Sequence, residues 1–190
     1  MTNRATSNGL SWSRIARRVR VPLGFVFAAF YFWRARPDWL TLVVGGAVAV
    51  LGVFVRAMAS GQVKKNEELA TTGPYAYCRN PLYLGSIIIA IGFAIAARDI
   101  WVALGIVLLF TAIYVPVIRS EEAFLRGRFL GYDEYARRVP RLLPRSIWLR
   151  GSAGGFSREL YLQHREYNAS IGAAAMWAAL VIKMFWFSGS

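Results

Sequence analysis

Residues 82–118 read LYLGSIIIAIGFAIAARDIWVALGIVLLFTAIYVPVI, and their only charges are Arg98 and Asp99 near the middle. An α-helix needs about 20 apolar residues to cross about 30 Å of hydrocarbon, so each half approaches the length of one membrane span. The two-residue link leaves room only for a sharp reversal between the halves. This stretch therefore predicts a tight helical hairpin in a membrane, with both of its outer ends at the same membrane face.

Three further apolar stretches flank the hairpin, and they extend the prediction to the whole chain. The first of them is short and needs the preceding residues to complete a crossing. We expect an all-α integral membrane protein with about five transmembrane helices, a single domain over 21–190, and an interfacial basic amphipathic segment over 1–20. The expected spans are about 21–33, 39–59, 82–97, 100–118 and 169–188, with a cytoplasmic segment over 119–168.

The composition supports a membrane protein and excludes several other classes. Of 190 residues, 56% are apolar and 17% are charged, and the formal net charge is +13. Soluble domains carry about a quarter charged residues, and disordered chains have few apolar ones. A nucleic-acid-binding protein would spread its basic residues over a soluble surface. One cysteine and one histidine argue against a disulfide framework and against a zinc site, so we expect no nucleic acid and no metal.

The distribution of positive charge predicts the orientation. Most Lys and Arg residues lie before the first expected span, between the second and third, and after the fourth. These segments share one side of the membrane if there are five spans, and positive loops favour the cytoplasm. We therefore expect a cytoplasmic N-terminus and an outside C-terminus, with the basic segments near anionic lipid headgroups.

Polar residues concentrate in two segments that the hairpin should bring together. In the first, Pro81 suits the first turn of a helix, and Arg79 before it adds positive charge to a helix N-terminus, which favours an anionic group. In the second, Glu122 has Arg126 one turn away as a partner, whereas Glu121 has no such neighbour and suits a hydroxyl or a cationic amine. Interfacial Tyr and Arg are also common as simple anchors. The spacing alone predicts a polar interfacial pocket without a specific reaction.

A third polar cluster, at residues 164–168, precedes the last span. A lone interfacial histidine such as His164 is usually only hydrogen-bonded. Cys78 is expected to be a small packing residue, because no histidine lies near it in the sequence to activate a thiol.

Residues 73–85, GPYAYCRNPLYLG, resemble the signature of the isoprenylcysteine carboxyl methyltransferase and phospholipid methyltransferase superfamily. In that superfamily an Arg-His-Pro or Arg-Asn-Pro run is followed, one pair of spans later, by Glu-Glu, which is the place of Glu121-Glu122 here. Residues 129–144 resemble the family's tail of Gly, paired Tyr and Val-Pro-Arg. The resemblance covers about 64–144, and the last span is similar to that of bacterial members, which implies a bacterial inner membrane.

The resemblance implies an integral membrane enzyme that binds S-adenosylmethionine at the cytoplasmic interface and releases S-adenosylhomocysteine. Asn80 replaces the histidine of the isoprenylcysteine enzymes, so their cofactor contacts are not carried over unchanged. The residues that the resemblance assigns to the cofactor are Tyr75, Arg79, Asn80, Pro81, Tyr83, Leu84, Glu121, Glu122, Tyr135 and Arg141.

The acceptor implied by the resemblance is a lipid or another hydrophobic small molecule, and N-, O- and S-methylation all stay open. We expect Arg79, Glu122 and Arg165 to be catalytic, with Arg165 near an anionic headgroup and Glu166 or Glu122 near an amine. Two alternatives remain, which are a membrane reductase that uses NADPH on a similar scaffold and a non-catalytic lipid-binding protein. The expected substrate-binding residues are His164, Arg165, Glu166 and Asn168.

Overall fold

The computed structural model describes residues 22–63, 68–144 and 155–188, and within these ranges its regular structure is entirely α-helical. The all-α fold class predicted from the sequence is confirmed for this part of the chain. The basic amphipathic segment expected over 1–20 lies outside the described residues.

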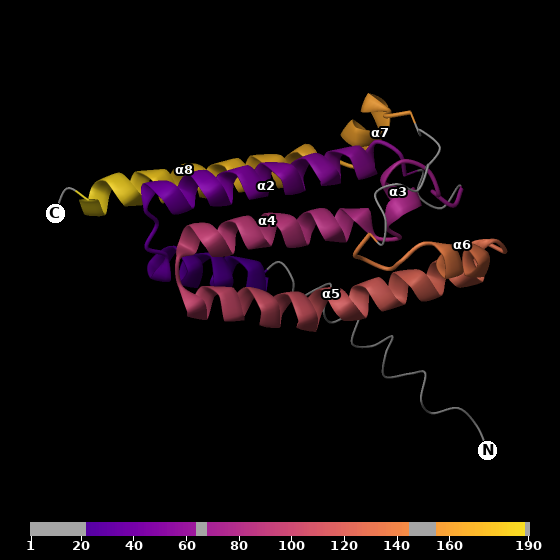
Figure 1. Ribbon diagram of the computed structural model, residues 1–190, viewed down its shortest axis with the longest axis horizontal. Helices are drawn as coiled ribbons and strands as arrows, with labels where there is room; N and C mark the ends of the chain where they lie inside the picture. Colours follow the sequence, from indigo (N-terminus) through magenta and orange to yellow (C-terminus); the bar gives the residue numbers. More distant parts are fainter. Residues whose placement is uncertain (1–21, 64–67, 145–154, 189–190) are drawn as a thin grey trace, which may run out of the picture.

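Four long helices run along one common axis, as Figure 1 shows. They are α2 (Trp39–Ser60), α4 (Pro81–Ala97), α5 (Ile100–Arg128) and α8 (Tyr167–Ser188). A further helix over residues 22–34 precedes α2. Three short helices lie together at one end of the long ones, which we call the short-helix end (Figure 1). These are α3 (Pro74–Tyr77), α6 (Tyr132–Arg138) and α7 (Arg158–Gln163).

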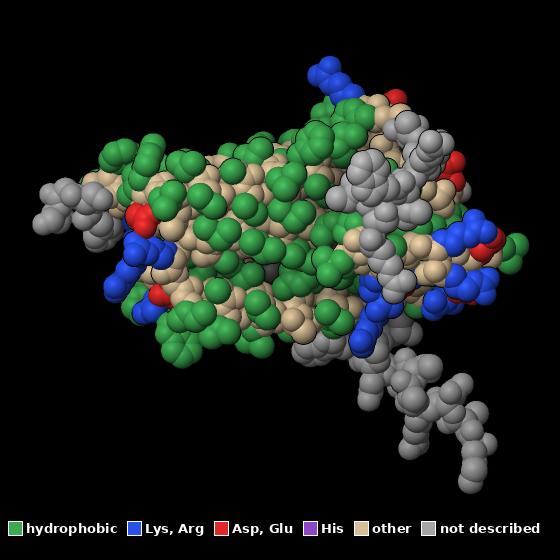
Figure 2. All heavy atoms as spheres, viewed as in Figure 1, with side chains coloured by type: hydrophobic (Ala, Val, Ile, Leu, Met, Phe, Trp, Pro, Cys, Tyr) green, Lys and Arg blue, Asp and Glu red, His purple; other side chains and the backbone are tan. Residues whose placement is uncertain are grey.

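The surface of the long helices is that of a membrane protein. Three of them are long and apolar enough to cross a bilayer, namely Trp39–Ser60, Ile100–Arg128 and Tyr167–Trp186, while Pro81–Ala97 is apolar but shorter. Large apolar side chains such as Val50, Leu108 and Trp186 are exposed, as lipid-facing side chains would be. On the face shown in Figure 2, hydrophobic side chains cover the middle and charged ones gather at the two ends. The chain is an integral membrane protein.

The hairpin forms as expected, but its second helix is longer than the predicted span. α5 continues ten residues past Ile118, to Arg128, because residues 119–128 contain mostly good helix formers and no proline. Glu121 and Glu122 therefore lie on the part of this helix that extends beyond the predicted span. The last helix begins at Tyr167, two residues before the predicted boundary.

Two charged residues make the turn of the hairpin. Arg98 ends α4 in the left-handed conformation, with a φ of 50°, and Asp99 caps α5 by accepting from the amides of Trp101 and Val102. Asp99 also pairs with Arg34 at 2.6 Å. Burial opposes the ionised form, but the amide bonds and Arg34 lower the pKa of Asp99 below its ordinary value. The turn is thereby tied to the end of the helix over residues 22–34.

α2 and α4 pack closely against each other through glycines. A Cβ placed on Gly92 would lie 2.5 Å from the carbonyl oxygen of Gly45, so neither helix can carry a larger residue there without moving. Such close backbone approach is the usual role of small residues between membrane helices. The hydroxyl of Tyr31 donates to the Phe93 carbonyl at 2.9 Å beside this contact. The interior cluster comprises Tyr31, Ala35, Leu42, Ala96, Ala97, Val102 and Leu180.

Candidate functional site

The start of α4 and the last third of α5 meet at the short-helix end. The side-chain amide of Asn80 donates to Oε1 of Glu122 at 3.0 Å, although the residues are 42 positions apart. Asn80 precedes Pro81, the first residue of α4, and its side chain makes no cap to that helix. The juxtaposition predicted from the hairpin is therefore present.

Glu122 is a buried carboxylate surrounded by hydrogen-bond donors. It is only 4% exposed, and Arg141 donates to it through Nε and Nη2 at 2.8–3.1 Å. Nη1 of Arg79 lies 3.7 Å from it. A buried charge is tolerated only when it is paired and hydrogen-bonded, and Glu122 meets both conditions. It joins the start of α4 and the segment after α6 to α5, while the partner expected from spacing, Arg126, pairs with Asp133 instead.

Arg79 is held among aromatic side chains of α3 and α6. Its Nη1 donates to the Tyr132 hydroxyl at 3.4 Å, and its buried Nε has no hydrogen-bond partner among the described residues. Tyr135 donates its hydroxyl to the Tyr75 carbonyl at 2.7 Å. Burial raises the pKa of Tyr75, Tyr132 and Tyr135 above their ordinary value, so all three phenols are neutral.

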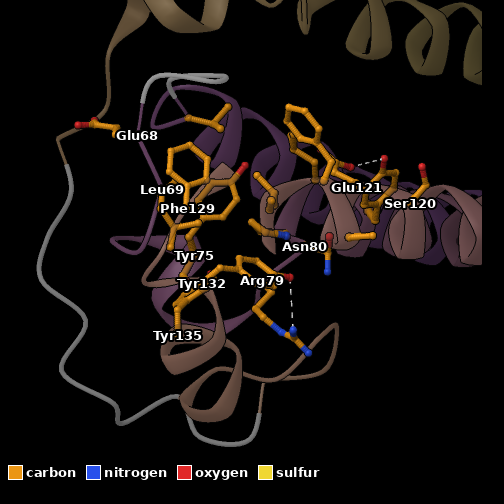
Figure 3. A pocket seen from close by; sticks show the side chains of 18 of the residues that line it. Glu68, Leu69, Tyr75, Arg79, Asn80, Ser120, Glu121, Phe129, Tyr132 and Tyr135 are labelled. Atoms are coloured by element: carbon orange, nitrogen blue, oxygen red, sulfur yellow. Dashed lines mark hydrogen bonds between the residues drawn. The ribbon is translucent and has the colours of Figure 1, made fainter. Parts of the chain in front are cut away.

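These groups surround a pocket of about 880 Å³, which we call the helix-end pocket. Figure 3 shows Tyr75, Tyr132 and Tyr135 on one side of it and Ser120 and Glu121 on the other. Arg79 and Asn80 lie between the two sides (Figure 3). The volume is within the range of about 300–1,000 Å³ that suits small-molecule sites. The lining is mixed, with a guanidinium N–H that has no partner among the described residues, the two carboxylates of Glu68 and Glu121, several phenols, and apolar side chains from α5.

A second pocket of about 720 Å³ is lined mainly by the long helices, and we call it the inter-helix pocket. Its walls come from the helix over 22–34, from Arg56 of α2, from α4, from α5, and from Glu166 and the first half of α8. Most of the lining is apolar, and the charged side chains are Arg56, Glu121 and Glu166. A Cβ added to Gly172, which lines this pocket, would meet nothing within 4 Å.

Three residues line both pockets, namely Leu82, Tyr83 and Glu121. The Tyr83 hydroxyl donates to Oε2 of Glu121 at 2.8 Å. The Tyr83 ring meets Tyr114 edge to face, with ring centroids 5.6 Å apart, and Tyr114 in turn stacks on Phe110. The boundary between the pockets is therefore one hydrogen-bonded pair supported by aromatic contacts on α5.

The structure brings most of the predicted cofactor residues into one place. Seven of them line the helix-end pocket, which are Tyr75, Arg79, Asn80, Pro81, Tyr83, Glu121 and Tyr135. Leu84 lies one residue further into α4 and does not line it. Glu122 and Arg141 stand outside the lining and contact Asn80, Glu122 through its carboxylate and Arg141 through its carbonyl oxygen.

The residues of the third polar cluster, 164–168, do not all lie at one pocket. Glu166 lines the inter-helix pocket, whereas His164, Arg165 and Asn168 line neither pocket. Nδ1 of His164 lies 3.2 Å from the Ser60 carbonyl. Arg165 is exposed, with a φ of 52° between α7 and α8, and Asn168 is exposed on the first turn of α8.

Tyr132 and Arg56 are among the residues that line these pockets and that the sequence interpretation did not assign to a site. Tyr132 is 1% exposed and contacts Arg79; its spacing of three from Tyr135 puts both on one helix face, which was the available signal. Arg56 carries a charge inside the second span, which is by itself an indication of function.

Cys78 is buried against the segment after α6. Its Sγ lies 3.6 Å from the Arg141 carbonyl oxygen, and burial raises the pKa of the thiol to about 11. A thiol with so high a pKa is a poor nucleophile at neutral pH, which agrees with the packing role predicted for it.

Comparison with known proteins assigns the family. The phospholipid methyltransferase family model matches residues 39–130, from the start of α2 past the end of α5. This match contains the Asn80–Glu122 contact and both sides of the pocket boundary. The chain belongs to this methyltransferase superfamily. The resemblance carried by residues 73–85 and by Glu121-Glu122 is thus confirmed.

Individual relatives agree with that membership. The cobalt-zinc-cadmium resistance protein CzcN of Cupriavidus metallidurans is 36% identical over 160 residues, which are 80% of this chain and 73% of the relative. The nickel-cobalt-cadmium resistance protein NccN of Alcaligenes xylosoxydans xylosoxydans is 38% identical over 103 residues, 51% of this chain and 48% of the relative. The protein-S-isoprenylcysteine O-methyltransferase of Schizosaccharomyces pombe is 28% identical over 155 residues, 73% of this chain and 61% of the relative. No solved structure matches the chain.

The names of the first two relatives refer to metals, whereas the described residues of this chain contain no group of three or more His, Cys, Asp or Glu side chains placed to hold a metal ion. The family points to a membrane methyltransferase, in which the two pockets and their shared boundary are the candidate site.

Proposed function

We propose that this protein transfers a methyl group from S-adenosylmethionine, bound in the helix-end pocket, to a lipid or other hydrophobic acceptor bound in the inter-helix pocket. The observation that carries the proposal is the boundary between the pockets, which consists of residues common to both. A water-soluble methyl donor and a hydrophobic acceptor need separate sites that touch at one point. The methyltransferase family of the chain supports the reaction class.

The helix-end pocket offers partners for each part of the methyl donor. The unpartnered Nε of Arg79 and the first turn of α4 suit its carboxylate. Glu121 suits ribose hydroxyls or the amino group, and the rings of Tyr75 and Tyr132 suit a flat heterocycle. When bound, S-adenosylmethionine supplies an electrophilic methyl group on a positively charged sulfur.

The chain's own residues then act mainly by positioning. An in-line methyl displacement depends on alignment and on removing water more than on acid and base groups. We assign to Glu122 the task of fixing Arg79 and Asn80, because its buried carboxylate contacts both. Leu84 and Arg141 support the same wall from behind.

The inter-helix pocket is the proposed acceptor site, with its apolar walls around the hydrophobic part. Small residues of α8, among them Ala169, Gly172 and Ala173, line it. We place the entrance near the start of α8, where Glu166 lines the pocket and where His164, Arg165 and Asn168 lie close in sequence. In the orientation predicted from the positive charges, this end of the bundle faces the cytoplasm. Nitrogen, oxygen and sulfur acceptors all remain compatible with this site.

The decisive experiment incubates the purified protein with S-adenosylmethionine that carries a labelled methyl group and with a total lipid extract of bacterial membranes. We expect label in one lipid class, identified by mass spectrometry. Arg79→Ala and Glu121→Gln should each lower the label at least tenfold, whereas Arg137→Ala, an exposed cation of α6, should not. A protein that binds S-adenosylhomocysteine but labels no lipid would contradict the proposed acceptor.

A thermal-shift comparison tests the methyl donor separately. S-adenosylhomocysteine should raise the melting temperature of the detergent-purified protein, since a ligand that binds only the native state stabilises it. Stabilisation by NADPH without any effect of S-adenosylhomocysteine would favour the reductase alternative.

A further inference from the structure

Arg56 is a charged residue inside a membrane-spanning helix, four residues before the end of α2. Such residues are costly to bury, and they commonly mark functional positions. Nε and Nη2 of Arg56 donate to Oε2 of Glu166 at 3.1 and 2.7 Å. Nη1 donates to the Leu82 carbonyl at 3.3 Å and to the Ser86 hydroxyl. The guanidinium thereby joins α2, α4 and the residue just before α8.

These contacts leave Arg56 little capacity to bind a substrate. A guanidinium has five N–H groups, and the bonds to Glu166, Leu82 and Ser86 use four of them. Glu166 differs, because both bonds from Arg56 end on Oε2, and Oε1 has no hydrogen-bond partner among the described residues. Since Glu166 lines the inter-helix pocket, the group on offer to a ligand is a carboxylate oxygen that Arg56 holds in place.

The charges that line the inter-helix pocket also indicate which acceptors it favours. Among the described residues that line it, the only cation is Arg56, and the anions are Glu121 and Glu166. The polar part of a largely apolar chamber is therefore net negative. Arg56 offsets the charge of Glu166, so an acceptor with a carboxylate would still meet the unbalanced negative charge of Glu121. An acceptor whose polar end is neutral or cationic meets no such cost.

We propose that Arg56 is a positioning residue that holds Glu166 toward the acceptor, and that this pair makes the inter-helix pocket select a neutral or cationic polar end over a carboxylate. The inference rests on the proposed function of that pocket. To that function it adds Arg56 as a positioning residue and a preference for acceptors without a carboxylate.

The first test is the chemical type of the methylated product. Alkali releases methanol from a methyl ester but not from an N-methyl, S-methyl or ether product. Lipid labelled by the full-length protein should therefore release less than a tenth of its label as methanol. Release of most of the label would identify a carboxylate acceptor and overturn the inference while the proposed function stands. Absence of any labelled lipid would instead refute the proposed function, and the inference with it.

The second test concerns the pair itself. Glu166→Gln and Arg56→Gln should each raise the KM for the labelled lipid about tenfold without changing the affinity for S-adenosylhomocysteine, and Arg56→Lys should recover part of the loss. Glu159→Gln, an exposed carboxylate on α7, is the matched control and should leave KM unchanged. A purely structural role predicts a lower melting temperature with an unchanged KM, and that result would overturn the assignment of Arg56.

Discussion

The hydroxyl of Tyr83 lies 2.8 Å from Oε2 of Glu121, and both residues line the two pockets at once. A methyl group that passes from one pocket to the other must cross beside this pair. The Tyr83 ring is held against Tyr114, so its position does not depend on the hydrogen bond alone. The bond instead fixes the carboxylate of Glu121, which is otherwise exposed.

Tyr83→Phe tests this arrangement because it removes the hydroxyl and keeps the ring. A hydrogen bond to a charged group contributes about 1.5–3 kcal/mol, so loss of alignment at the boundary should lower kcat by about tenfold or more. The affinity for S-adenosylhomocysteine should change much less, since Arg79 and the backbone of the first turn of α4 stay in place. Tyr161→Phe on α7, which also keeps its ring, is the control. An unchanged kcat in Tyr83→Phe would contradict a role for the hydroxyl.

Glu122→Ala should destabilise the protein more than any surface carboxylate does. Removing the buried carboxylate leaves Asn80 and Arg141 without a shared hydrogen-bond acceptor and Arg79 without its ion-pair partner, and breaking a buried ion pair costs about 3–5 kcal/mol. The measurement is thermal unfolding in detergent, with and without S-adenosylhomocysteine. Glu134→Ala removes an exposed pair with Arg138 on α6, and it should cost less than about 1 kcal/mol. Equal effects of the two substitutions would show that Glu122 does not support the site.

The sequence predicted the hairpin and its consequences because these follow from local patterns. Two apolar runs joined by Arg98-Asp99 can only turn back, and that geometry predicted that the polar segments before α4 and at the end of α5 would lie side by side. The partners of Glu122 were not predictable in the same way. Spacing favoured Arg126, one turn away, whereas the structure supplies Arg141 from a segment beyond α6, and such tertiary competition is invisible to periodicity.

The length of α5 follows from helix propensity. Hydropathy falls after Ile118, but α5 continues to Arg128, because helix propensity and not hydropathy decides where the backbone stops being helical. Tyr132 and Arg56 were missed because their places at the pockets depend on residues that are distant in the sequence. A side chain becomes part of a pocket only when elements distant in sequence enclose it, although the lone charge of Arg56 within a span was a readable sign.

Gly172→Leu tests the proposed acceptor pocket without touching the proposed methyl-donor site. Gly172 lines the inter-helix pocket, and open space surrounds the place of its missing Cβ, so a leucine should fill part of the chamber. We expect turnover of the lipid acceptor to fall at least tenfold while S-adenosylhomocysteine still binds with its usual affinity. Gly127→Leu makes the same change on α5, also into open space and away from that pocket, and it should leave turnover intact.

Cys78 should resist thiol reagents in the folded protein. It is 1% exposed, and with a pKa of about 11 only about one thiol in a thousand is ionised at pH 8. The reactive thiolate fraction rises with pH toward 11 and falls below it. Maleimide labelling at pH 7.5 should be slow until sodium dodecyl sulfate unfolds the chain. An Arg137→Cys thiol in a Cys78→Ala background should react at once, and rapid labelling of the native Cys78 would contradict its burial.

Gly52→Ala probes the interface on which both pockets depend. A Cβ at Gly52 would lie 2.6 Å from the Ile89 amide nitrogen and 2.7 Å from the Gly85 carbonyl oxygen. These are backbone atoms and cannot rotate away, so α2 and α4 must separate, and overpacking of this kind costs about 1–3 kcal/mol. Gly24→Ala is the matched control, because its Cβ would meet nothing within 4 Å, and alanine favours a helix over glycine by up to about 1 kcal/mol. The melting temperature should therefore fall for Gly52→Ala and stay level or rise for Gly24→Ala.

Gly52→Ala should also lower turnover, because α4 carries Tyr83 at the pocket boundary. A destabilised variant with full turnover would show that the site tolerates movement of α4.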